Sequence, residues 1–145
     1  MRSAMSITRT ALAGLIAAGI VALAGCGGME SRGGQSLTLT GAQEVPPVST
    51  PATGSGTITV HADRAVTGSV TVSGMSAVAA HIHTGAPGQN GPVIIPLAQS
   101  GNTWSVPAGA RLTDAQYDSY KAGHLYVNVH SANHKGGEVR AQLKP

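Results

Sequence analysis

Three histidines lie in two segments of the chain that each have the pattern of a β-strand. His81 and His83 flank Ile82 in the first segment, and His130 ends the second segment, which begins at Leu125. Side chains alternate between the two faces of a strand, so His81 and His83 share a face and Ile82 points to the other. Same-face residues lie about 6.5–7 Å apart at Cα, a spacing from which two imidazoles can reach one ion. The pattern predicts a transition-metal site.

The third histidine, His130, follows the same alternation. It shares a face with Tyr126 and Asn128, whereas the valines between them point to the opposite face. If the two segments pair side by side, His130 supplies a third ligand beside His81 and His83. Imidazole nitrogens suit copper, zinc and nickel, and a simple histidine site usually binds Cu(II) most tightly. The cofactor expected at such a site is one copper or zinc ion.

The same histidines could instead hold neighbouring loops in place. A histidine with a hydrogen-bond partner on each ring nitrogen is an ordinary structural group. The bonds expected on this alternative run from His81 or His83 to the backbone of residues 85–91, and from His130 to Asn133 or Glu138. The sequence leaves both interpretations open.

Other kinds of catalytic site have little support in the sequence. The chain has no Gly-x-Ser-x-Gly motif and no phosphate-binding glycine loop, and its six carboxylates do not fall into catalytic pairs. We therefore predict no catalytic residues. Glu44, in a proline-rich stretch, is expected to form a structural ion pair with Arg140 that ties this stretch to the last strand.

The N-terminus has the features of an export signal. Two arginines precede an apolar run at residues 11–24, which is shorter than the roughly 20 residues needed to span a bilayer. The run ends in Leu23-Ala24-Gly25-Cys26, which resembles the bacterial lipobox and implies that Cys26 carries a lipid. Residues 1–25 are then a lipoprotein signal peptide and residues 26–35 a flexible tether. The expected location is a bacterial membrane, at the outer membrane and periplasm or at the cell surface.

The charge of the chain does not favour nucleic acid as a partner. Nine basic and six acidic residues give a formal charge of +3, and removal of residues 1–25 takes away Arg2 and Arg9, so that seven bases face six acids. No basic stripe with interleaved aromatic residues is present. The predicted partners are the membrane, through the lipid anchor, and a protein that the sequence does not identify.

Short segments rich in Val, Thr and Ile alternate with turns along the rest of the chain. This texture predicts an all-β fold, an antiparallel Greek-key-like β-sandwich or barrel. The expected strands cover residues 37–40, 56–61, 65–73, 78–83, 93–97, 103–106, 125–130 and 138–143. One short helix is expected over residues 112–123, because Thr113 and Gln116 have capping-box spacing and Gly123 follows the last turn.

Three motifs in this order resemble the CHRD domain, a module named from chordin, over residues 36–145. They are Leu39-Thr40-Gly41-Ala42-Gln43-Glu44-Val45-Pro46-Pro47, Ala80-His81-Ile82-His83 with the following glycine-rich loop, and Leu125–Ser131 with Gly136–Leu143. In chordin the module sits in an extracellular protein that binds growth factors. The resemblance therefore implies a binding or structural module rather than an enzyme.

A looser similarity is to the copper-zinc superoxide dismutase sandwich, in which a His-x-His strand and a later strand histidine hold copper. His81, His83 and His130 would occupy comparable places. A second histidine-rich loop for zinc is missing, so the similarity implies a mononuclear site at most. It also supplies the alternative function, a copper-dependent redox enzyme.

Overall fold

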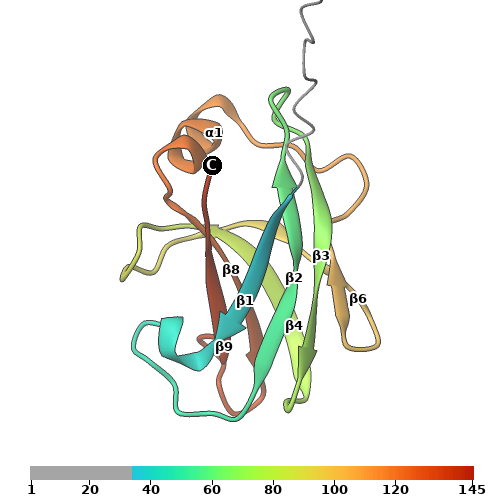
Figure 1. Cartoon of the computed structure of the whole chain (residues 1–145), viewed down its shortest axis with the longest axis vertical. Coiled ribbons are helices and arrows are strands. Elements are labelled where there is room, and N and C mark those ends of the chain that lie inside the picture. Colours follow the sequence, from blue (N-terminus) through green and yellow to red (C-terminus); the bar gives the residue numbers. More distant parts are fainter. Residues whose placement is uncertain (1–33) are drawn as a thin grey trace, which may run out of the picture. The chain divides into compact units, whose positions relative to one another are not determined.

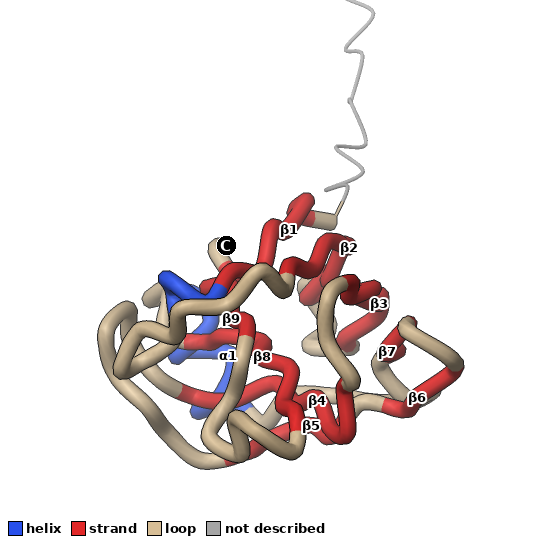
Figure 2. Tube along the Cα trace, turned by 90° about the horizontal axis from the view of Figure 1, so that it is seen from below, coloured by secondary structure: helices blue, strands red, loops and turns tan. Residues whose placement is uncertain are grey.

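The computed structural model describes residues 34–145. They form one antiparallel sheet of nine strands in the order β5-β4-β8-β9-β1-β2-β3-β7-β6, curled into a nearly closed barrel (Figures 1 and 2). The elements are β1 (Gln35–Thr40), the 3₁₀ turn η1 (Gly41–Gln43), β2 (Thr53–Val60), β3 (Val66–Ser73), β4 (Ala77–Thr84), β5 (Val93–Pro96), β6 (Ala98–Ser100), β7 (Thr103–Ser105), α1 (Asp114–Lys121), β8 (Leu125–Ser131) and β9 (Val139–Leu143).

The prediction of an all-β antiparallel fold with one short helix is confirmed. The predicted signal peptide, Cys26 and most of the predicted tether lie outside the described residues. No helix within residues 34–145 is long and apolar enough to cross a membrane.

The largest difference from the predicted strands is at residues 93–100. One strand was expected over residues 93–97, but the chain forms β5 and β6 on either side of Leu97. The side chain of Leu97 is buried, and its amide donates to Ala80 O at 2.9 Å. The chain thus leaves the edge of β4 and joins β7, which brings the two ends of the sheet together and almost closes the barrel.

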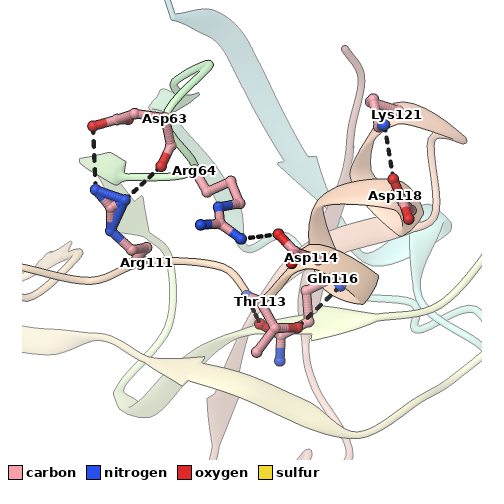
Figure 3. Close-up of polar contacts among 8 residues, drawn as sticks. All are labelled: Asp63, Arg64, Arg111, Thr113, Asp114, Gln116, Asp118 and Lys121. Carbon is pink, nitrogen blue, oxygen red and sulfur yellow. Dashed lines mark hydrogen bonds and ion pairs between the residues drawn. The ribbon is translucent and has the colours of Figure 1, made fainter.

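The helix is shorter than predicted, but its capping box is present. Gln116 N donates to Thr113 Oγ1 at 3.2 Å, and Thr113 N donates to Gln116 Oε1 at 2.9 Å (Figure 3). Both contacts satisfy amides that a helix start leaves free. An ion pair from Arg64 to Asp114 connects the first turn of α1 to the β2–β3 turn. The helix is therefore held against the end of that hairpin.

The interior of the barrel is filled by aliphatic side chains from most of the strands. The sequence contains no phenylalanine, and Trp104 is buried at 3% exposure. Leucine, isoleucine and valine side chains therefore supply most of the core. The residues with no exposed surface are Leu39, Val70, Ile82, Leu125, Val127, Val129 and Val139.

Strand β8 is buried on both faces. Leu125, Val127 and Val129 face the aliphatic core, whereas Tyr126 and Asn128, each 2% exposed, point the other way. Loops cover this outer face, so a buried polar layer lies outside the sheet opposite the core. The candidate site lies in this layer.

We predict that truncating the core residue between two of the histidines destabilises the whole barrel. Ile82→Ala should lower the free energy of unfolding by about 2–5 kcal/mol, because Ile82 is completely buried and its truncation leaves a cavity. Val78→Ala is the matched control on the same strand. Val78 is 59% exposed, so its change should stay within about 0.5 kcal/mol. Urea unfolding of both variants measures the difference, and equal effects would contradict this placement of the core.

Candidate metal centre

Strands β4 and β8 bring the three predicted histidines together. In the antiparallel register His83 lies opposite Tyr126 and His81 lies opposite Asn128. His130 follows two residues later on β8, opposite Ala79. The ring centroids of His81 lie 5.5 Å from those of His83 and 4.9 Å from those of His130. One nitrogen from each ring lies within 4.8 Å of the others. The strand pairing therefore produces the cluster that the alternation predicts.

The ring of His83 is oriented by a backbone carbonyl. Its Nδ1 lies 2.9 Å from Gly91 O, which can only accept, so Nδ1 carries the proton. Nε2 of His83 is buried and has no hydrogen-bond partner. A neutral His83 therefore presents an unshared electron pair on Nε2.

His130 is oriented in the same way. Its Nδ1 donates to Lys135 O at 2.8 Å, and its Nε2 lies 3.0 Å from His81 Nδ1. Since Nε2 of a neutral His130 can only accept, His81 donates this bond. Histidine ligands of metals in proteins usually hold their second nitrogen by such a contact.

A stack of three side chains supports His83. The Tyr126 ring lies parallel to the His83 ring, with centroids 4.7 Å apart and an angle of 4°. The guanidinium carbon of Arg140 lies 3.5 Å from the centroid of the same tyrosine ring. Gly91 N donates to Tyr126 Oη at 3.2 Å. Gly91 thus contacts both His83 and Tyr126, and a Cβ there would collide with Thr84 O.

Arg140 ties the loop after β4 to the sheet. It is 1% exposed and donates to Gln89 O at 2.9 Å and to Ala86 O at 3.3 Å. Asn90 from the same loop donates to Val45 O at 2.6 Å. Two loops far apart in the sequence therefore meet beside the histidines.

The electrostatics of the cluster favour neutral imidazoles. Burial lowers the pKa of His81, and the neighbouring His130 and His83 lower it further. Burial also lowers the pKa of His83, while its hydrogen bond to Gly91 acts in the opposite direction. Neutral imidazole is the form that binds metals, so both rings are in their ligand form at neutral pH.

Glu44 and Arg140 are both buried and the charge of each acts on the other, but no ion-pair contact joins them among residues 34–145. The ion pairs of residues 34–145 join other residues, and Arg140 donates to the 86–90 loop and Gln142 instead. Burial raises the pKa of Glu44 to about 7. The charge of Arg140 and hydrogen bonding from Asn128 and the Val45 amide act in the opposite direction. Glu44 Oε1 is buried without a hydrogen-bond partner.

A family model described as the CHRD domain matches residues 35–143. The chain belongs to the CHRD domain family. No curated protein and no solved structure matches the chain. The match agrees with the predicted domain of residues 36–145.

Within this CHRD domain, the structural contacts expected of the histidines are present in part. His83 bonds the backbone of the 85–91 loop as the loop-holding alternative predicts, but His130 bonds Lys135 O rather than Asn133 or Glu138. Both contacts use Nδ1, so that Nε2 of His83 stays without a partner and Nε2 of His130 meets His81. They orient the rings and so are compatible with metal binding.

Sequence reasoning missed the groups that orient the rings of this CHRD domain. The carbonyls of Gly91 and Lys135 belong to loops, and no side-chain type marks a backbone acceptor. Tyr126 and Asn128 were correctly placed on the His130 face by alternation, but their contacts were not predicted. The available signal was the glycine at position 91, where the loop passes too close to Thr84 for any side chain.

Because burial raises the pKa of Glu44, ionising this group lowers the free energy of unfolding. We predict that Glu44→Gln removes this pH-dependent loss of stability. Between pH 4.5 and 7 the folded state binds more protons at Glu44 than the unfolded state, so this group lowers the free energy of unfolding as pH rises. Wild type and Glu44→Gln should be similar in stability near pH 4. At pH 8 the variant should be more stable by on the order of 1–3 kcal/mol. Urea unfolding of metal-free protein tests this, and a pH-independent difference would contradict it.

Proposed function

We propose that this protein is an exported, lipid-anchored CHRD-domain module that binds one transition-metal ion, copper or zinc, through His81, His83 and His130. The observation that carries the proposal is the orientation of His83. Its Nδ1 is held by Gly91 O and its buried Nε2 has no partner, while one nitrogen of each of the three histidines lies within 4.8 Å of the others. Leaving a buried acceptor unpaired costs about 1–3 kcal/mol, which an ion at this nitrogen would offset.

The distances in the cluster require only a small adjustment. Two nitrogens bound to one ion at about 2.0–2.1 Å can be at most about 4.2 Å apart. The three nitrogens already lie within 4.8 Å of one another, so modest ring rotations would bring them onto one ion. Three imidazoles form a donor set that binds copper and zinc well, with Cu(II) above Zn(II) in affinity.

A binding role fits the site better than the alternative of a copper-dependent redox enzyme. Catalysis needs a coordination position that substrate can reach. Tyr126 stacks on His83, and His83 and His130 are 7% and 9% exposed. Of the three histidines only His81 is partly exposed, so the cluster meets solvent through a single ring.

The support for export and anchoring comes from the sequence. A basic N-terminus, an apolar run and Leu23-Ala24-Gly25-Cys26 form the pattern of a lipoprotein signal. An anchored module would present its histidine cluster to the periplasm or the cell exterior, and the partner there would be a metal ion or a protein that exchanges one.

We predict that Cu(II) and Zn(II) raise the melting temperature of the full-length protein at pH 7.5, and raise it less at pH 5. A site filled at 100 times its dissociation constant adds about 2.7 kcal/mol to the free energy of unfolding, which corresponds to several degrees. Protons compete for the imidazoles as pH falls, so the gain should shrink. Differential scanning calorimetry of protein purified in detergent, without a histidine tag, measures both.

The controls separate the cluster from incidental binding. His83→Ala should abolish the metal-dependent rise, whereas the exposed His124→Ala should retain it. A rise that persists in the His81, His83 and His130 triple alanine variant would refute the proposed site. Dismutase activity of the copper-loaded protein would favour the redox alternative.

A further inference from the structure

A fourth polar side chain next to the histidines has a buried oxygen without a hydrogen-bond partner. Asn128 is 2% exposed and lies on β8 between Tyr126 and His130, directly opposite His81 on β4. Its Oδ1 is buried and accepts no hydrogen bond, as His83 Nε2 and Glu44 Oε1 also do not. A buried amide oxygen without a donor is uncommon and calls for a physical explanation.

The surroundings of Asn128 fix which way its amide points. Nδ2 donates to Gly136 O at 3.4 Å, and it lies against Gly137 beside the carboxyl of Glu44. These neighbours are acceptors, so the NH₂ group belongs on their side and the oxygen on the opposite side. A side chain at Gly137 would collide with Glu44, which explains the glycine at this close approach.

Asn128 is also a close neighbour of His83. It lies two residues from Tyr126, which is opposite His83 in the β4–β8 register and stacks on the His83 ring. In the neutral ring the proton is on Nδ1 and bound to Gly91 O. Two acceptors on this polar side of β4 and β8, His83 Nε2 and Asn128 Oδ1, are then buried without a hydrogen-bond donor. A cation placed there would satisfy both.

We propose that Asn128 Oδ1 is the fourth ligand of the metal, giving a donor set of three nitrogens and one oxygen that favours Cu(II) or Zn(II) over Cu(I). The inference rests on the proposed function. An amide oxygen is a hard ligand that contributes more to binding a divalent ion than a soft monovalent one. A fourth ligand also completes the four-coordinate geometry typical of closed zinc sites.

The test compares the two oxidation states of copper in one variant. Asn128→Leu keeps the size of the side chain but removes the oxygen, and Asn128→Asp keeps an oxygen at the same place. Affinities for Cu(II), Zn(II) and Cu(I) are measured on the full-length protein by competition with chelators specific for each ion. Electron paramagnetic resonance of the Cu(II) form reports the ligand set directly.

We expect Asn128→Leu to weaken Cu(II) and Zn(II) at least tenfold and to leave Cu(I) within about twofold. Each tenfold loss specific to Cu(II) raises the reduction potential by about 59 mV. Asn128→Asp should retain or strengthen Cu(II) binding. The copper spectrum should change in the leucine variant and stay four-coordinate in the aspartate variant.

Each other outcome overturns the inference in a recognisable way. Unchanged Cu(II) affinity and spectrum in Asn128→Leu would mean that Asn128 Oδ1 is satisfied by an internal water, while the histidine site itself stands. Equal weakening of Cu(I) and Cu(II) would mean a general structural defect rather than a lost ligand. If the wild-type protein binds neither ion through its histidines, both the inference and the proposed function fail.

Discussion

The buried guanidinium of Arg140 organises the polar side of this barrel. A cation that is 1% exposed must direct its N–H donors to acceptors within the protein, because an unpaired buried charge is very costly. These acceptors include the carbonyls of Ala86 and Gln89, so the loop after β4 closes over the sheet around the arginine. The same group lies on the ring of Tyr126, which in turn stacks on His83. The position of a candidate ligand thus depends on one arginine two strands away.

Strand β8 explains how a small domain can hold both a dry core and a polar cluster. Its valines complete the aliphatic interior, and its alternate residues Tyr126, Asn128 and His130 form the centre of the outer layer. A strand buried on both faces has little freedom to shift, because a one-residue slip would exchange the two sets of side chains. The register that builds the core is therefore the register that places His130 diagonally across from His81, within hydrogen-bond distance.

Most of the correct predictions about the site came from the alternation of side chains along the strands. It separated Ile82 from His81 and His83, and it placed Asn128 on the face of His130, because period-two patterning is local and survives in any sheet. The covering loops could not be predicted in this way. Contacts such as His83 to Gly91 O and Asn90 to Val45 O depend on where distant loops meet, and backbone carbonyls carry no residue-specific signal. For the same reason the expected pairing of Glu44 with Arg140 did not anticipate that the arginine directs its donors at loop carbonyls.

The hydrogen bond between His81 and His130 has a consequence for the exchange of an ion. In the metal-free chain the proton on His81 Nδ1 is shared with His130 Nε2. The folded protein therefore does not have to keep the unshared electron pairs of all three imidazoles close to one another. On the proposed function, His81 would bind an ion through Nδ1 only if its proton were held on Nε2 instead, the ring nitrogen that the contact with His130 leaves free of that role. On the proposed function, a cluster held in this way would suit an ion that binds reversibly better than a permanently bound structural ion.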